Sequence, residues 1–446
     1  MGDAGLLCGA MAERSRLLSV LGTAFGLAVI VGTTIGAGIL GTPGDVAARL
    51  PSPWLILAVW VTGALYAFGG ANAICELGTM MPYSGGQYHF ARRALGPYAG
   101  FLVGWNDWIS TAGTATAVAL LLAESGTRLV PALEGHATAL AATIILAFTM
   151  LIARGIREGA VSQQVTSALK AAMLLVLIAA AVVYASTHGA ASQRAPVLPQ
   201  GLALGAAVVL AMQSVIYTYD GWTGAIYFSE ELRDPAHEIP RATFGGLTAV
   251  VVIYLLVNCA LLVVVPMAQL AGDPLAAGVL ARTIFGDAGD TLLRVIIVVS
   301  LLSAVNANLL LGPRVLFAMA RDRLAPEWAA HVNPGGTPAP ALLATSSIAL
   351  LFLLTGTFSE VVSVLSFFFV ATYTISFSAV FVLRRREPDA PRPYRARGHP
   401  WTTATMIAGS LAFLVGSIVS YPRHGLVAAA LVALSYPAFR LIARRG

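Results

Sequence analysis

The sequence predicts an all-α integral membrane protein with 12 transmembrane helices, and two properties of its composition support this fold class. Apolar residues make up 57% of the 446 residues, and a helix needs roughly 20 of them to cross a hydrocarbon core about 30 Å thick. Charged residues make up only 11%, against about 25% in a typical soluble domain. A water-soluble globule of this composition would lack the polar surface that it needs.

Apolar runs separated by polar breaks predict the individual spans. They lie at residues 19–49, 53–80, 97–123, 137–153, 164–186, 203–228, 243–267, 289–318, 339–357, 360–383, 402–421 and 424–442. Residues 273–287 have the composition of a short helix outside the membrane, and the Pro- and Arg-rich stretch 384–400 that of a solvated loop. Residues 1–446 therefore form a single polytopic membrane domain.

The arginines are distributed unequally between the two sides of the bilayer. If the N-terminus is cytoplasmic, 20 arginines fall on the cytoplasmic side and 6 on the other. Cytoplasmic loops carry the excess of basic residues in membrane proteins, so we expect both termini in the cytoplasm. The net charge of +6 then reflects orientation in the lipid bilayer and not nucleic-acid binding.

No pattern of reactive residues indicates an enzyme, a metal or another cofactor. The three cysteines fit neither a disulfide framework nor a zinc site. The seven histidines lie almost entirely in loops. We therefore expect a protein that is not an enzyme.

The first span contains an unusual number of glycines, namely Gly32, Gly36, Gly38 and Gly41. Each weakens a helix by roughly 1 kcal/mol relative to alanine. One interpretation is close packing of helices through small residues. The other is an unwound segment at the bilayer midplane whose freed amides and carbonyls bind a ligand. Such backbone is tolerated only where protein or a water-lined cavity surrounds it.

The sixth span has a matching feature in residues 217–224, where Asp220 lies among two glycines and several aromatic residues. A carboxylate in the middle of a span is costly and therefore marks a functional site. Spans one and six are the first helices of two five-span halves. Interruptions at corresponding places indicate an inverted-repeat transporter with its binding site at the breaks.

Lys170, in the fifth span, is the only lysine in the chain. It could be a snorkelling residue near a helix end. Unlike arginine, however, a buried lysine amine can lose its proton. Other polar residues within spans are expected to form interhelical hydrogen bonds: Glu76, Asn106, Asp107, Gln213, Ser303, Asn306 and Asn308. We expect Glu230 and Glu231 to form a helix-end network with Arg233, Asp234 and Arg241.

Four stretches in the same order along the chain resemble motifs of the amino acid–polyamine–organocation superfamily, and most closely its L-type amino acid transporter branch. Residues 32–40 are similar to G-[ST]-x-[IV]-G-[SA]-G-I-F, and residues 75–88 contain E-L-G-x-x-x-P-x-S-G-G-x-Y. Residues 219–241 resemble the stretch around the sixth span, and residues 314–326 contain R-x-x-x-x-x-A-R-D. The resemblance covers nearly the whole chain.

The resemblance implies a LeuT-type fold in which helices 1 and 6 are broken. The first five-helix repeat would span residues 19–186, the second 203–383, and helices 11 and 12 residues 402–442. It also implies how a substrate amino acid binds. Its carboxylate would meet the backbone amides of Ala37, Gly38 and Ile39, and its ammonium the carbonyls of Thr34, Tyr217 and Asp220.

Lys170 matches the family's fifth-span lysine, whose charge takes the place of the second sodium ion near Thr33 and Ser303. This implies transport without sodium. Two departures stand out. Leu40 replaces the usual phenylalanine, and residues 124–136 lack the cysteine through which eukaryotic members link to a glycoprotein subunit. We therefore expect no disulfide-linked partner.

The sequence thus predicts a secondary transporter that moves L-amino acids across a plasma membrane. The Ala- and Arg-rich composition indicates that this is a bacterial inner membrane. A side-chain pocket lined by Tyr217, Tyr219 and Trp222 favours neutral amino acids. Coupling by exchange and coupling to protons both remain open. Alternatives are a polyamine or cationic amino acid carrier and, in another class, a channel or a non-transporting nutrient receptor.

Overall fold

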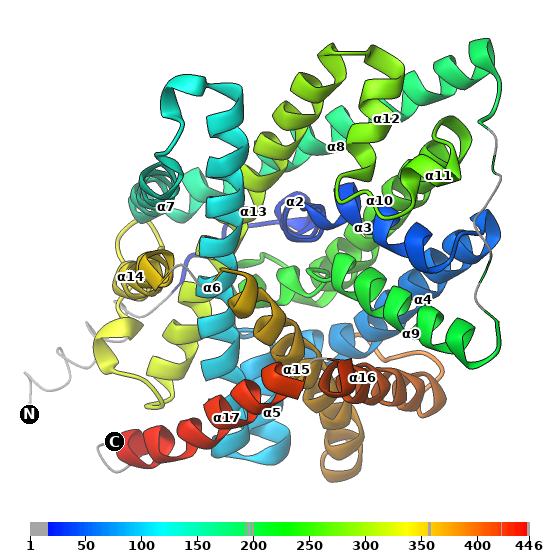
Figure 1. Ribbon diagram of the computed structural model, residues 1–446. Coiled ribbons are helices and arrows are strands. Elements are labelled where there is room, and N and C mark those ends of the chain that lie inside the picture. Colours follow the sequence, from blue (N-terminus) through cyan, green and yellow to red (C-terminus); the bar gives the residue numbers. More distant parts are fainter. Residues whose placement is uncertain are drawn as a thin grey trace, which may run out of the picture.

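The chain is built of helices (Figure 1). The computed structural model describes residues 17–443 except 192, 194–197, 199, 356, 357 and 421. For some of these it describes the backbone only: 131, 355, 358–367, 420, 422–425, 427–429, 431 and 443. The helices are α2 Thr23–Thr34, α3 Gly38–Arg49, α4 Pro53–Met80, α5 Gln87–Leu95, α6 Pro97–Leu129, η1 Pro131–Leu133, α7 Ala137–Arg154, α8 Ile156–His188, α9 Leu202–Thr218, η2 Gly224–Glu231, α10 Pro235–Val264, α11 Met267–Leu270, α12 Ala276–Phe285, α13 Ala288–Arg321, η3 Glu327–Ala330, α14 Ala339–Thr355, α15 Phe358–Arg386, α16 Trp401–Ser420 and α17 Pro422–Ala443.

Several of these helices are suited to crossing a bilayer. Within the described residues, seven are long and apolar enough to do so, and the bent pair α2 and α3 makes an eighth span if it is counted as one. Shorter apolar helices lie in α9, α12, α14 and α17. The chain is therefore a multi-span α-helical membrane protein, as its composition predicts. That there are twelve crossings remains a prediction.

Element boundaries follow the apolar runs most closely where the helix is apolar to its ends. The bounds of α4 coincide with the predicted run 53–80, and α12 confirms a short helix within 273–287. In contrast, α8 begins at Ile156 and not near 164, because its first turns carry Arg157 and Glu158. The amphipathic helix α5 was likewise not predicted, since its polar face hides it from a search for apolar runs.

The first span is broken as the glycines predict. The span bends by 45° between α2 and α3. Ile35, which follows α2, has an extended backbone with φ −76° and ψ 95°. Close packing also explains one of the glycines. A Cβ on Gly32 would lie 2.8 Å from the hydroxyls of both Ser167 and Ser303, on α8 and α13. Close packing thus accounts for Gly32, and the predicted unwinding is confirmed at residues 35–37. Ligand binding by the freed backbone groups stays a prediction.

The sixth span is broken as well. Helix α9 ends at Thr218, and the 3₁₀ helix η2 begins at Gly224. Gly221 lies between them with φ +118°, a backbone conformation that favours glycine. The two breaks are neighbours, because the Thr33 hydroxyl donates a hydrogen bond to the Gly221 carbonyl at 2.9 Å.

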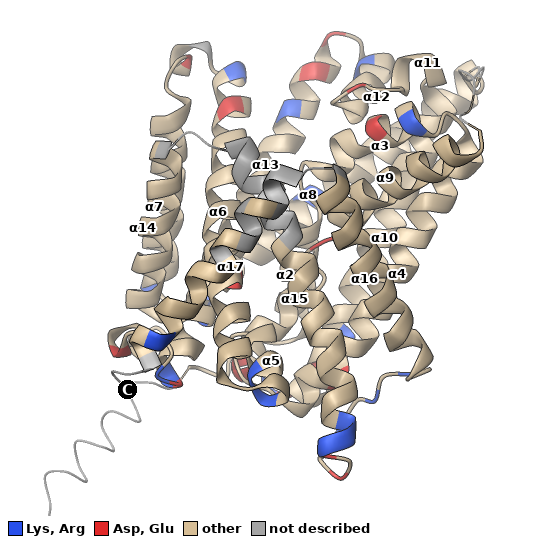
Figure 2. Ribbon diagram, turned by 60° about the horizontal axis from the view of Figure 1, so that its bottom comes forward, with Lys and Arg blue, Asp and Glu red and all other residues tan. Residues whose placement is uncertain are grey.

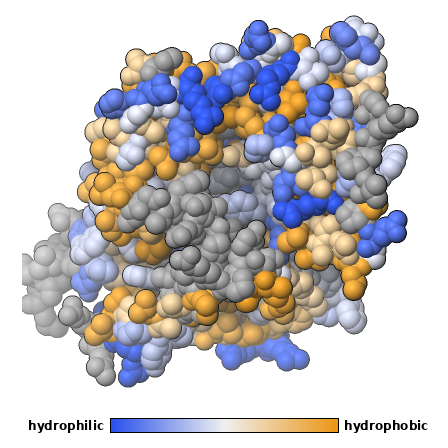
Figure 3. Space-filling model, viewed as in Figure 1, coloured by the Kyte–Doolittle hydropathy of each residue, from blue (hydrophilic) through white to orange (hydrophobic). Residues whose placement is uncertain are grey.

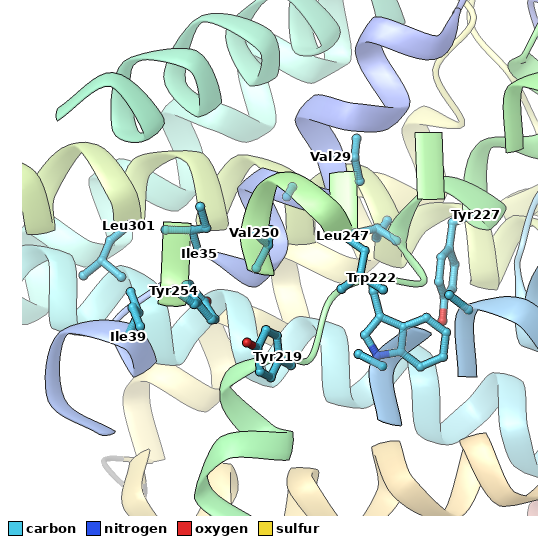
Figure 4. Packing of buried hydrophobic residues seen from close by; sticks show 14 of the residues in the cluster. Val29, Ile35, Ile39, Tyr219, Trp222, Tyr227, Leu247, Val250, Tyr254 and Leu301 are labelled. Atoms are coloured by element: carbon cyan, nitrogen blue, oxygen red, sulfur yellow. The ribbon is translucent and has the colours of Figure 1, made fainter. Parts of the chain in front are cut away.

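The core surrounds α2, which packs against α8, α10 and α13 (Figure 1). Helix α13 packs in turn along α6. Apolar side chains from these elements fill the space around the breaks, among them Val29, Ile35, Ile39, Leu247 and Leu301 (Figure 4). This packing holds the non-helical backbone inside the protein, away from lipid, where such backbone is tolerated.

Charged residues lie mostly at the two ends of the bundle (Figure 2). Several arginines that were assigned to the cytoplasm are at one end. There Arg93 of α5 pairs with Glu387, which follows α15, and Arg386 donates to the Ala94 carbonyl. The termini themselves, 1–16 and 444–446, lie outside the described residues, so their side of the membrane remains a prediction.

Residues 384–400 are largely exposed, as expected of a solvated loop, and only Ala396 among them is buried. The segment is not a free loop, however, because its first three residues belong to α15 and several of its groups bind α4. Glu76, which is 1% exposed, accepts hydrogen bonds from Arg384 and from the Ala396 amide, and it pairs with Arg392. Asn72 accepts a further bond from the Arg397 amide. The segment is fastened to α4 because a buried carboxylate requires donors.

Candidate functional site

A cavity of about 320 Å³ lies where the two breaks face α6, α13 and α15. The face of the molecule seen in Figure 3 is hollowed near its centre. The residues that line the cavity are Thr33, Thr34, Gly36, Ala37, Gly38, Gln87, Asp107, Thr111, Thr114, Ala117, Val118, Leu121, Tyr217, Thr218, Asp220, Gly221, Thr223, Gly224, Tyr227, Leu301, Ala304, Asn308, Leu311, Phe369 and Tyr373. The size is sufficient for a small polar molecule.

Most of the predicted substrate residues are brought together here. Those that line the cavity are Thr34, Ala37, Gly38, Tyr217 and Asp220. The others lie behind it. Ile39 is fully buried in the apolar core, and Trp222 is 2% exposed with its ring stacked on Tyr373 at 5.0 Å. Tyr219, predicted beside them in the side-chain pocket, packs against Trp60.

The backbone at the breaks offers opposite partial charges to the cavity. Helix α3 begins at Gly38, and the first N–H groups of a helix have no acceptor within it, so they favour an anion. Helices α2 and α9 end at Thr34 and Thr218, where the last carbonyls favour a cation. This arrangement is suited to a zwitterion.

Two acidic side chains lie in the cavity wall. Asp107 on α6, 6% exposed, accepts a hydrogen bond of 2.7 Å from the Tyr227 hydroxyl, and Asp220 accepts one from Tyr373. Gln87 also donates to the Tyr227 hydroxyl, at 3.4 Å. Among the described residues that line the cavity, none is lysine, arginine or histidine.

Asp107 forms the interhelical hydrogen bond that was expected of it, but it also faces the cavity. Its position at the cavity was not predicted from the sequence. A carboxylate within a span was the available signal, and the same reasoning that singled out Asp220 applies to it.

Lys170 lies deep within the protein. Its side chain is 0% exposed, and its Nζ donates to the carbonyls of Gly32 at 2.9 Å and Ile35 at 2.6 Å. A snorkelling lysine would instead extend its amine to the membrane surface. The amine therefore caps the carbonyl end of α2 directly before the break.

The two residues predicted near Lys170 have other hydrogen-bond partners. Ser303 bonds to Ser167 at 3.0 Å and to Gln163 at 3.1 Å, and Thr33 donates to Gly221. Ser167 donates in turn to the Ala28 carbonyl at 2.7 Å. This cluster ties α8 and α13 to α2 beside the lysine, and Gln163 and Ser167 were not identified from the sequence.

The acidic pair after the sixth span binds partners other than those expected. Glu231 pairs with Arg314, and both side chains are 0% exposed. Glu230 pairs with Arg321, whereas Asp234 pairs with His237. The partners of the two glutamates come from α13 and not from the nearby Arg233 and Arg241, because η2 lies against α13.

Comparison with known proteins agrees with this architecture. Residues 20–436 match the protein family described as amino acid permease. The chain is 30% identical to the serine/threonine exchanger SteT of Bacillus subtilis, over 91% of this chain and 92% of that protein. It is 27% identical to the mouse b(0,+)-type amino acid transporter 1, over 92% and 85% of the two chains.

A third relative differs in its named substrate. The methylthioribose transporter of Bacillus subtilis is 28% identical, over 86% of this chain and 85% of that protein. The three relatives are all transporters, and two of them are named for amino acids. Because the family match spans most of the chain, the protein belongs to the amino acid permease family of the amino acid–polyamine–organocation superfamily, whose members are membrane transporters and not enzymes.

Proposed function

We propose that the protein is a secondary active transporter that carries neutral L-amino acids across the plasma membrane by alternating access. The observation that carries the proposal is the meeting of two helix breaks at one cavity, with helical amides on one side and carbonyls on the other. The substrate carboxylate binds the amides of Ala37, Gly38 and Ile39. Its ammonium binds the carbonyls of Thr34, Tyr217 and Asp220.

The arrangement proposed for the whole chain is the LeuT type, with twelve spans, five-helix repeats at 19–186 and 203–383, and both termini cytoplasmic. Trp222 supports the side-chain pocket from behind Tyr373. No disulfide-linked glycoprotein partner is required. A bacterial inner membrane is the proposed location.

The protein works without sodium in this proposal. The ammonium of Lys170 supplies the charge at the carbonyl end of α2, on Gly32 and Ile35, and the neighbouring cluster that includes Ser303 holds α8 and α13 against it. Thr33 links the two breaks. The amine acts either as a permanent charge in an exchanger or as a proton carrier in a symporter.

Uptake into liposomes tests the proposal. Labelled L-serine and L-threonine are the first substrates, because the relative SteT is named for their exchange. Uptake should not require sodium, and methyl esters and decarboxylated amines should compete at least about tenfold worse, because each lacks one charged partner. Counterflow of labelled substrate distinguishes a carrier from a channel or a non-transporting receptor. Absence of amino acid uptake would refute the assignment.

Variants of Lys170 test the coupling. Lys170→Ala should strongly reduce transport while the protein remains folded. Lys170→Arg keeps the positive charge, but the guanidinium does not lose its proton. Retained activity therefore favours the exchanger, and lost activity favours the symporter. Unchanged uptake in Lys170→Ala, or uptake that depends on sodium, would exclude the proposed role.

A carrier of polyamines or cationic amino acids is the second candidate. It is favoured by the two carboxylates, Asp107 and Asp220, in a cavity wall whose described residues include no cationic side chain. A neutral substrate leaves both carboxylates without a cation, whereas a second positive charge on the substrate would pair with one of them. Competition by L-lysine and putrescine at equal or lower concentration than L-serine would favour this candidate.

A further inference from the structure

One buried hydroxyl lies at the ends of both broken helices. Tyr254 of α10 is 0% exposed, and its hydroxyl oxygen is 2.7 Å from the Thr34 carbonyl and 3.1 Å from the Thr218 carbonyl. These carbonyls belong to the last residues of α2 and α9, and both residues line the cavity. A single side chain outside the breaks thus contacts the carbonyl end of each.

In this contact the hydrogen-bond acceptors outnumber the donors. A phenol has one O–H to donate, and here it faces two carbonyl acceptors, each with two lone pairs. The two carbonyls therefore keep acceptor capacity after the hydroxyl has donated. An ammonium has three donors and can use that capacity. The hydroxyl itself holds the two carbonyls close together.

We propose that Tyr254 is a positioning residue for the substrate's ammonium group. It orients the carbonyls of Thr34 and Thr218 so that together they accept a second, cationic donor from the cavity. This inference rests on the proposed function, and it adds a residue on α10 and the Thr218 carbonyl to the ammonium site.

Ring packing keeps the hydroxyl in place. The Tyr254 ring lies 5.6 Å from Trp60 at 85°. It lies 5.1 Å from the Tyr219 ring, which is labelled beside it in Figure 4. Tyr66 of α4 provides a matched control away from the breaks. It is 9% exposed, and its hydroxyl forms a hydrogen bond of 2.6 Å with the Ser410 hydroxyl of α16. Removing either hydroxyl deletes one buried oxygen and its hydrogen bond, but only the Tyr254 hydroxyl contacts the breaks.

The experiment compares Tyr254→Phe with Tyr66→Phe in proteoliposomes. It uses labelled L-serine and, as competitor, L-glycerate, in which a hydroxyl replaces the ammonium. In Tyr254→Phe, KM for serine should rise about tenfold with little change in kcat, as expected for a lost hydrogen bond near a charged group. The Ki of glycerate should change less than about twofold, because that ligand has no ammonium. Tyr66→Phe should alter neither value.

Equal weakening of serine and glycerate would show a general structural role and overturn the inference, as would equal effects of the two variants. If Tyr254→Phe does not yield folded protein, a fluorotyrosine at position 254 keeps the shape and strengthens the donor. Serine affinity must then change while glycerate affinity does not, and an unchanged serine affinity also overturns the inference. Wild-type protein that takes up no amino acid would refute the proposed function itself, which is a separate outcome.

Discussion

The ion pair between Arg314 and Glu231 offers the sharpest test of how η2, beside the break of the sixth span, is held against α13. It joins α13 to the end of η2 through two bonds, Nε to Oε1 at 2.5 Å and Nη2 to Oε2 at 2.9 Å. The guanidinium also donates to the Leu310 carbonyl and lies 4.4 Å from the Phe228 ring centroid. Both charged side chains are 0% exposed.

A second pair in the same protein has similar geometry and a different environment. Arg93 bonds to Glu387 through Nε at 3.1 Å and Nη2 at 2.5 Å, but the two side chains are 39% and 32% exposed. Removing one member of a buried pair costs about 3–5 kcal/mol because the other charge is left without a partner. An exposed pair contributes only about 0.2–1 kcal/mol.

We therefore expect Arg314→Ala to destabilise the protein several times more than Arg93→Ala. The assay is the temperature at which half of the detergent-purified protein loses its monodisperse elution peak. Because such unfolding is commonly irreversible, all variants are heated at the same rate. The midpoint should fall by roughly 5 °C or more for Arg314→Ala and by about 1–2 °C or less for Arg93→Ala.

The double variant Arg314→Leu with Glu231→Leu distinguishes two causes of lower stability, an unpaired buried charge and the loss of side-chain packing. Replacing both charges with apolar side chains is often neutral or stabilising, so this variant should recover most of the midpoint. Equal shifts for Arg314→Ala and Arg93→Ala would refute the reasoning. A double variant as unstable as Arg314→Ala alone would do so as well.

Three further predictions concern topology, substrate binding and pH. A cysteine at the exposed position Arg395, in a cysteine-free background, should react with an impermeant reagent only in inverted or opened vesicles, and labelling of intact cells would place this segment outside. Gly38→Ala should raise KM for L-serine about tenfold or more, because its Cβ would lie 3.0 Å from the Thr218 side chain and beside the proposed carboxylate position. The control is Gly205→Ala, which has open space around the new Cβ and should leave KM unchanged. Burial lowers the pKa of His89 in the folded protein, so below about pH 6.5 the unfolded chain binds more protons and the stability should fall as the pH drops. His89→Gln should reduce this fall of the unfolding temperature at low pH. An identical pH profile for the variant would contradict the assignment.

The sequence by itself determined the class of the fold and the places where it is interrupted. Long apolar runs indicate membrane helices because the free energy of placing a segment in lipid depends mainly on its own composition. Glycines and an intramembrane aspartate mark the breaks for the same local reason, since a helix is weakened by the residues it contains. Lys170 stood out as the only lysine, within a span, without knowledge of its partners.

Only the tertiary structure decided which side chains meet. Asp107 faces the cavity and Trp222 does not, although both lie in spans and near other polar or aromatic residues. Arg314 and not Arg233 pairs with Glu231, and Tyr254 reaches two carbonyls from a helix that shows no break. Such contacts depend on how helices distant in sequence cross and rotate against one another. In spans that are apolar on nearly all sides, no periodic pattern along the chain records that rotation.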